Sequence, residues 1–305
     1  MRWIEVCVDT PGGEIDARCE ELAALGAGGF VIENEDDFRE FLENNRQYWD
    51  YVDRELEESY SGVSRIKTYL ADDADGRAIL AAIRERYPSL GVSYVEDSDW
   101  ENNWREYYKP IEVGERLVVV PEWEETPQNG RIPLRLDPGL IFGTGSHPTT
   151  RMCLAALEGC AGPGKRVLDL GCGSGILSIA SRLLGATEAT AVDIDPIAES
   201  IAYENAEMNG IGRDNYHVLI GNVLSDTRLQ KKIAGQYPVV AANIVADVII
   251  ALAPIARPLV AAGGVFLVSG IIDERVDEVK KALNDAGFSV EEHKRAEGWN
   301  AFLCR

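Results

Sequence analysis

The sequence offers little that would bind a metal ion or cross-link the chain. It has six cysteines, at positions 7, 19, 153, 160, 172 and 304, and only three histidines, at positions 147, 217 and 293. No two cysteines have the C-x-x-C spacing, and no cysteine stands at zinc-finger spacing from a histidine. We therefore expect no metal site, and we expect reduced thiols, which are typical of cytoplasmic proteins.

Long hydrophobic runs are also missing. The most apolar stretch, 239–256, is interrupted by Asn243 and Asp247, which argues against a membrane span. The first ten residues, MRWIEVCVDT, lack the charged-then-apolar order of a signal peptide. An apolar fraction of 46% in 305 residues still allows a substantial core. These features predict a globular cytoplasmic protein without a membrane partner.

Basic residues are scarce as well. The chain has 30 Lys and Arg against 51 Asp and Glu, a formal charge of −21. Residues 1–108 hold 26 acidic and 11 basic side chains, so this first third carries −15 of that charge. A nucleic-acid partner is disfavoured, because such proteins present a basic face. The acidic third is either a solubilising surface or a surface that attracts a basic protein.

Residues 1–97 alternate short strand-like and helix-like segments. Strands are expected at 3–8, 29–34, 64–71 and 91–96, and helices at 14–27 and 72–87. This order predicts a ferredoxin-like α+β domain, a fold that defines no function by itself. Between its halves, the acidic segment 36–60 is expected to be a partly helical insertion.

Residues 98–115 are expected to form a linker helix and a connection to a second domain. The aromatic residues Trp100, Trp104, Tyr107 and Tyr108 recur at helical spacing ahead of Pro110. They form either a packing face or a surface on which a substrate stacks.

Residues 116–305 predict an α/β domain. After strands at 116–123 and 132–138, strands are expected at 166–170, 188–194, 216–221, 238–244 and 264–270, helices at 175–185, 196–210, 245–260 and 273–287, and a closing hairpin at 288–295 and 299–304. Such alternation predicts a mostly parallel sheet with helices on both faces. Ligands of such sheets bind at the carboxyl ends of the strands.

The motif VLDLGCGSGIL (167–177) marks one of these ends. Gly171, Gly173 and Gly175 let the chain turn sharply and let a ligand approach the backbone. The G-x-G-x-G spacing is one residue shorter than the dinucleotide fingerprint, and Asp169 precedes it, so an NAD-dependent oxidoreductase is disfavoured. Asp169 is instead suited to accept a hydrogen bond from a ligand amino group.

The next two strand ends carry further polar residues. Asp193 lies 22 residues after Gly171, where a carboxylate binds both hydroxyls of a ribose. Asp195 is expected to cap the helix that Pro196 begins. Asn243 ends the fourth strand of the sheet and either caps the next helix or orients an amine at the reacting centre.

The segment IFGTGSHPTT (141–150) has the composition of a functional loop. It holds no lysine and does not join a strand to a helix, so it is not a phosphate cradle. Pro148 followed by two threonines predicts a helix start. Gly143 and Gly145 would let the preceding loop fold over the ligand site.

Together these motifs resemble class I S-adenosylmethionine-dependent methyltransferases, which also end in an antiparallel hairpin. The segments LDPGLIFGTGSHPTT, VLDLGCGSGILSIA, DIDP, ANIVADVI and WNAFLCR closely resemble the PrmA family, bacterial enzymes that methylate protein eleven of the large ribosomal subunit. Ser146 stands where a threonine would be expected, and the hydroxyl is retained.

The resemblance implies the cofactor, the substrate and the site. The cofactor would be S-adenosyl-L-methionine, held by Thr150, Gly171, Asp193 and Asn243, with Phe142, Gly173 and Asp169 beside them. The substrate would be a basic ribosomal protein, methylated on lysine side chains and on its N-terminal amine and recognised by the ferredoxin-like domain. A monomer is expected.

The residues after Asn243 bear on the choice of acceptor. Asn-Ile-Val-Ala lacks the prolines and the aromatic residue of methyltransferases that act on amides or nucleobases, which favours an aliphatic amine. His147 is either a general base or a loop histidine bonded to the backbone. The alternatives are another N-methyltransferase on the same core and a binding module that uses the cofactor only as a ligand.

Overall fold

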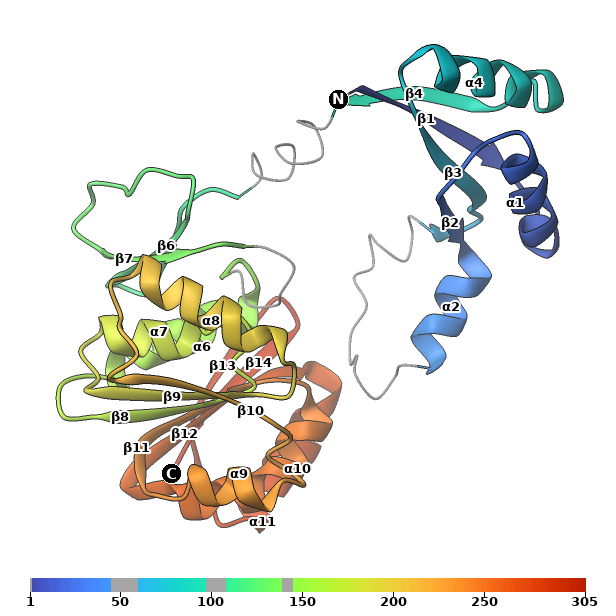
Figure 1. The fold of residues 1–305 in the computed structure, drawn as a ribbon. Coiled ribbons are helices and arrows are strands. Elements are labelled where there is room, and N and C mark those ends of the chain that lie inside the picture. Colours follow the sequence, from blue (N-terminus) through green and yellow to red (C-terminus); the bar gives the residue numbers. More distant parts are fainter. Residues whose placement is uncertain (1, 45–59, 97–107, 139–144) are drawn as a thin grey trace. The chain divides into compact units, whose positions relative to one another are not determined.

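The computed structural model describes residues 2–44, 60–96, 108–138 and 145–305, and the chain divides into two compact units, Met1–Tyr107 and Tyr108–Arg305 (Figure 1). Residues 108–115, which the sequence placed in a connection, include strand β5 (Ile111–Val113), and β5 pairs with β6 (Leu117–Pro121) in the second unit. Trp100, Trp104, Tyr107 and residues 45–59 of the acidic segment lie outside the described residues.

The first unit has the predicted ferredoxin-like fold. Its elements are β1 (Arg2–Asp9), η1 (Gly12–Glu14), α1 (Ile15–Ala24), β2 (Phe30–Asn34), α2 (Glu35–Asn44), β3 (Ser64–Ala71), α4 (Ala74–Arg86) and β4 (Gly91–Glu96). The sheet order is β2-β3-β1-β4, and each neighbouring pair is antiparallel. Alternate residues of β1, such as Ile4 and Val6, are buried in one core with Leu22 of α1 and Ile83 of α4. Asp73 caps α4 by accepting from the Gly76 N–H.

The second unit contains the predicted α/β sheet. Its elements after the small sheet β5-β6-β7 (β7, Ile132–Leu136) are α6 (Pro148–Cys160), β8 (Arg166–Leu170), α7 (Ile176–Leu183), β9 (Glu188–Asp193), α8 (Ile197–Met208), β10 (Tyr216–Ile220), α9 (Thr227–Lys232), β11 (Tyr237–Asn243), α10 (Ala246–Ala256), η4 (Arg257–Leu259), β12 (Val260–Ile272), η5 (Asp273–Arg275), α11 (Val276–Asp285), β13 (Val290–Ala296) and β14 (Trp299–Cys304). The seven strands are ordered β10-β9-β8-β11-β12-β14-β13. The first five are parallel, and β14 is antiparallel to both of its neighbours.

Helices cover both faces of this sheet, with α6, α7 and α8 on one face and α9, α10 and α11 on the other (Figure 1). Successive strand residues therefore enter two separate cores. In β11, Val239 and Ala241 lie in the core with α6 and α7, whereas Val240 and Ala242 lie in the core with α10. This burial of both faces is why the parallel strands are continuous hydrophobic runs.

Candidate active site

Three of the predicted site residues follow the carboxyl ends of neighbouring parallel strands. Gly171 follows β8, Asp193 ends β9, and Asn243 ends β11. The strands run outward as β8-β9-β10 on one side and β11-β12 on the other, so the order of the sheet reverses between β8 and β11. Open α/β sheets bind their ligands at such a switch point.

The glycine loop after β8 depends on residues without a side chain. Gly171, Gly173 and Gly175 have φ values of 78°, 49° and 78°, in the left-handed region that favours glycine. A Cβ atom on Gly171 would lie 2.4 Å from Cγ2 of Ile244, and one on Gly175 would lie 2.5 Å from the hydroxyl of Tyr216. The loop therefore needs glycine for its conformation and for its close packing.

Asp169 lies beneath this loop and is fully buried. Its Oδ2 accepts from the Ser178 N–H at 3.0 Å, at the start of α7, whereas its Oδ1 has no partner among the described residues. Burial raises the pKa of Asp169 to about 7, and the bonds from Ser178 partly offset this increase. A buried acceptor atom without a donor is unusual in a folded protein and indicates a ligand donor.

Asp193 organises the backbone around it. Its Oδ2 accepts from the Gly173 N–H at 2.8 Å and its Oδ1 accepts from the Asp195 N–H at 2.9 Å. Asp195 in turn accepts from the N–H of Ile197, the first residue of α8, at 2.9 Å, although Pro196 and not the predicted Asp195 holds the N-cap position. Each Asp193 oxygen keeps a second lone pair, so the carboxylate can still accept from the two hydroxyls of a ribose.

Asn243 does not cap the helix that follows it, because its side chain points to α6 instead. Its Nδ2 donates to Oγ1 of Thr150 at 3.3 Å, while its Oδ1 is buried and has no partner among the described residues. Thr150 is fully buried in the first turn of α6. The structure thus joins two of the predicted site residues, and Thr150 orients the amide of Asn243.

His147 caps α6. Its Nδ1 lies 2.7 Å from Oγ1 of Thr149 and 3.4 Å from the Thr149 nitrogen, and its ring packs edge-on against Trp299 with centroids 4.8 Å apart. Burial, with a smaller contribution from Arg151, lowers the pKa of His147, which keeps the imidazole neutral at pH 7. With Nδ1 engaged by its own helix start, the imidazole fits the backbone-bonded role better than that of a base.

The loop ahead of α6 is described only in part. Phe142 and Gly143 lie outside the described residues. Gly145 has a φ of 85°, and a Cβ atom there would lie 2.9 Å from Cγ1 of Val119, so this position requires glycine.

Two exposed apolar residues beside Asp193 were not among the predicted site residues. Ile194 directly follows Asp193 and is 65% exposed, and Ile197, at the start of α8, is 59% exposed. These exposed aliphatic side chains lie next to Asp193 in the chain and offer an apolar surface beside it. The signal in the sequence was the apolar residue between two aspartates in DIDP.

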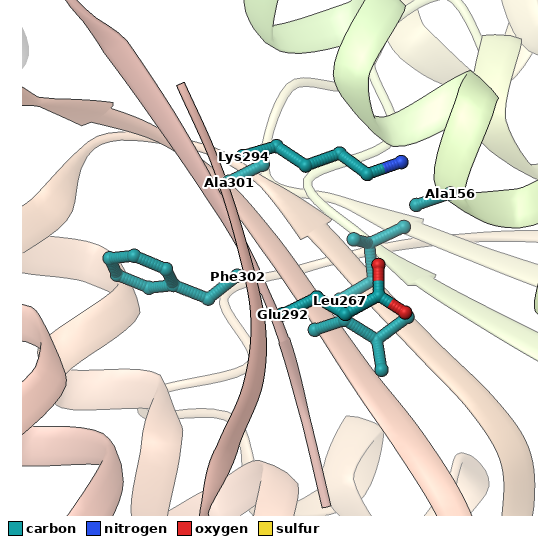
Figure 2. Close-up of a pocket in the computed structure, with 7 residues that line it drawn as sticks. Ala156, Leu267, Glu292, Lys294, Ala301 and Phe302 are labelled. Carbon is teal, nitrogen blue, oxygen red and sulfur yellow. The ribbon is translucent and has the colours of Figure 1, made fainter. Parts of the chain in front are cut away.

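The structure also has a hollow elsewhere, between α6 and strands β12, β13 and β14 (Figure 2). Ala156, Glu292 and Lys294 line it and also line an adjoining hollow of about 230 Å³. None of the predicted site residues lines either one. Their size lies below that of ordinary small-molecule sites, so we do not assign the cofactor there.

The residues at the switch point fit S-adenosylmethionine. Asp169 and Asn243 each present an acceptor atom without a partner among the described residues, and the cofactor carries an amino group and hydroxyls that donate. Asp193 is an acceptor at the second strand end, and Ile194 adds an exposed apolar surface. Among the described residues no group of three or more His, Cys, Asp or Glu side chains is placed to hold a metal ion, and no helix there is long and apolar enough to span a bilayer.

The strand order, the glycine loop and the acid that follows the second strand define a class I S-adenosylmethionine-dependent methyltransferase. Comparison with known proteins narrows this class. The family model described as Ribosomal protein L11 methyltransferase (PrmA) matches residues 2–305, and the chain belongs to this family. The protein is thus an S-adenosylmethionine-dependent protein methyltransferase, as the sequence motifs predicted.

Relatives from several bacteria share the full length of the chain. A ribosomal protein L11 methyltransferase of Exiguobacterium sp. is 38% identical over 100% of this chain and 99% of its own length. Another, from Heliobacterium modesticaldum, is 39% identical over 100% of this chain and 98% of its own. The crystal structure of a ribosomal protein L11 methylase from Lactobacillus delbrueckii subsp. bulgaricus matches 65% of this chain and 98% of that one, with 32% identity and a TM-score of 0.59.

Proposed function

We propose that this enzyme methylates ribosomal protein L11 on lysine side chains and on the N-terminal amine. The observation that supports this proposal most directly is the placement of Asn243. At the end of β11 a neutral amide presents a buried acceptor atom to the switch point and is oriented by Thr150. The names of the relatives supply the substrate protein.

S-adenosylmethionine supplies an activated methyl group when bound. We assign its amino group to Asp169 and its ribose hydroxyls to Asp193. The backbone of the loop from Gly171 to Gly175 would lie against its methionine part, and Ile194 would pack against the adenine. We assign Asn243, oriented by Thr150, to both the cofactor and the acceptor amine, since its amide oxygen has two lone pairs. Phe142 is expected to belong to the same site.

The acceptor amine must be neutral, because an ammonium has no lone pair. A free lysine has a pKa of about 10.4 and an α-amine about 7.7–8.0, so lysine needs the larger shift at neutral pH. A carboxylate beside the amine would raise its pKa, whereas the neutral amide of Asn243 accepts from the amine without adding charge. The residues around the amine therefore align the nucleophile with the methyl group, which is mainly catalysis by positioning.

The first unit is proposed to recognise the substrate. Residues 1–108 hold most of the excess negative charge of the chain, and α2 begins with three consecutive acids, Glu35, Asp36 and Asp37. Such a surface attracts a basic protein and accelerates its association at low ionic strength. We further propose that the enzyme acts in the cytoplasm as a monomer and without nucleic acid.

The test is to incubate the enzyme with unmethylated L11 and S-adenosylmethionine and to measure the intact mass of the substrate. We expect successive gains of one methyl group, and peptide mapping should place them on lysines and on the N-terminus. The rate should rise between pH 7 and pH 9 as the amines lose their protons. The variant Asp193→Asn serves as the site control and should bind the cofactor weakly. A substrate that gains no mass, while the enzyme binds the cofactor normally, would refute the proposed activity.

A further inference from the structure

Two asparagines one turn apart, one in helix α8 and one directly after it, are left unused by the proposed function. Asn205 is fully buried and Asn209 is half-buried. Residues four apart lie on the same face of a helix. Both side chains bond to the backbone of other segments, and Asn209, the C-cap residue of α8, also donates from its Nδ2 to the Asn205 carbonyl oxygen at 2.7 Å.

Asn205 links two segments that are distant in the sequence. Its Nδ2 donates to the carbonyl oxygen of Ser174 in the glycine loop at 2.9 Å. Its Oδ1 accepts from the N–H of Asp137, just after β7, at 3.0 Å. One buried side chain therefore fixes the spacing between the glycine loop and the end of β7.

Asn209 makes a similar clamp that does not involve the glycine loop. Its Oδ1 accepts from the Arg135 N–H at 2.9 Å, and its Nδ2 donates to the Arg135 carbonyl oxygen at 2.7 Å. Its amide thus bonds to both the N–H and the carbonyl of one β7 residue, as the backbone of a neighbouring strand would. The pair provides a comparison, because only the Asn205 side chain bonds to the glycine loop, whereas the Asn209 side chain bonds to Arg135 and to the Asn205 carbonyl oxygen.

The glycine loop depends on such bonds for its shape. Its three glycines restrict the backbone little by themselves. Asp193 holds the Gly173 N–H, and the carbonyl of Cys172 accepts from the Gly175 N–H at 2.8 Å. Asn205 adds a bond to the Ser174 carbonyl, which belongs to the same peptide group as the Gly175 N–H.

We propose that Asn205 is a positioning residue for cofactor binding. It holds the Ser174–Gly175 peptide, and thereby the backbone of the glycine loop, in the shape on which the proposed cofactor site depends. It also ties this loop to Asp137, which shortly precedes the segment that carries Thr150. This inference rests on the proposed placement of the cofactor at Gly171–Gly175.

The test compares Asn205→Ala, Asn205→Asp and Asn209→Ala in the full chain. Dissociation constants for S-adenosylmethionine are measured by titration calorimetry, and the KM values for the cofactor and for L11 are measured separately. Unfolding scans confirm that each variant is folded at the assay temperature. Asn205→Ala should raise the dissociation constant about ten-fold, in line with the loss of one buried hydrogen bond that orders a site. The KM for L11 should stay unchanged.

The two other variants separate positioning from stability. Asn205→Asp retains the acceptor for Asp137 but loses the donor to Ser174, so its cofactor affinity should fall as in Asn205→Ala. Asn209→Ala should lower the unfolding temperature and leave the affinity within about two-fold of the parent. Equal weakening in Asn209→Ala, or parental affinity in Asn205→Ala, would overturn the proposal.

The variant Asp193→Asn distinguishes this inference from the function on which it rests. If Asp193→Asn binds the cofactor weakly and Asn205→Ala binds it normally, only the positioning role fails. If Asp193→Asn also keeps full affinity, the placement of the cofactor is wrong and the positioning role fails with it.

Discussion

Replacing Asp169 with asparagine should make the protein more stable at pH 8, although it removes a residue of the proposed cofactor site. The side chain is fully buried, and burial raises its pKa from the ordinary value of 3.8 to about 7. Asparagine has nearly the same shape and keeps an oxygen that can accept from Ser178. The substitution therefore removes the charge, and it places an amide NH2 group where Oδ1 stood.

The sign follows from proton binding. The folded protein holds the Asp169 proton more tightly than the unfolded chain does, so folding stability falls as the pH rises from about 4 to about 7. The two pKa values differ by about three units, each equivalent to about 1.4 kcal/mol, so the cost above pH 7 reaches about 4 kcal/mol. Asparagine does not ionise and escapes this cost. The unfolding free energy of the variant should exceed that of the parent most at pH 8, and the difference should shrink towards pH 4.

Calorimetric unfolding of the full chain without cofactor measures this difference. For a unit of 150–250 residues, about 4 kcal/mol corresponds to an increase in Tm on the order of 10 °C. Asp169 lies outside the first unit, so the unfolding transition of that unit should not change and provides an internal control. A variant that is no more stable than the parent at pH 8, or whose advantage is the same at pH 5 and pH 8, would refute the reasoning.

The same variant should bind S-adenosylmethionine less well. The proposed partner of Oδ1 is a cationic amino group, and hydrogen bonds between charged groups are the stronger ones. We expect a dissociation constant at least ten-fold higher, measured by titration calorimetry at pH 8. Asp169 would then lower the folding stability of the protein while it strengthens cofactor binding, a combination that is common in functional sites.

Three further substitutions test other parts of the site. Gly270→Ala should abolish activity in methyl-transfer assays, because the φ of Gly270 is 91° and a Cβ atom there would lie 2.3 Å from the carbonyl oxygen of Ile244. The control is Gly263→Ala, since Gly263 has a φ of 70° and a Cβ atom there would meet nothing within 4 Å. Glu158→Ala should lower the unfolding free energy by roughly 2–3 kcal/mol and leave cofactor affinity unchanged, since its carboxylate accepts from two backbone N–H groups between β5 and β6 and from that of Leu117, the first residue of β6. Thr150→Val should weaken cofactor binding several-fold by freeing the amide that it orients, and unchanged affinity would limit this hydroxyl to a structural role.

The sequence predicted the features of the fold that depend on neighbouring residues. Alternating and helical hydrophobic spacing located the strands of the main sheet and the helices between them, and Pro148 marked the start of α6. The glycines at 171, 173 and 175 all adopt the left-handed conformations expected of a sharp turn. Each of these signals lies within a few residues of its structural consequence.

The contacts between distant segments could not be predicted in this way. Nothing in the sequence near Glu158 shows that its carboxylate binds the backbone of the turn between β5 and β6. Similarly, Asn243 has the pattern of a helix cap, and only the packing of α6 beside β11 shows that its amide meets Thr150. Short elements such as α9 and β5 were missed because their hydrophobic periodicity spans too few residues.

The position of β14 has a consequence for the way the protein is made. This strand is the last along the chain, yet it lies inside the sheet between β12 and β13. During synthesis the edge of β12 that pairs with β14 therefore stays unpaired until the hairpin of β13 and β14 has formed. This edge runs along the apolar residues 265–268, and an unpaired edge of this kind can pair with another chain. The main sheet is therefore completed only after the closing hairpin of β13 and β14 has been synthesised.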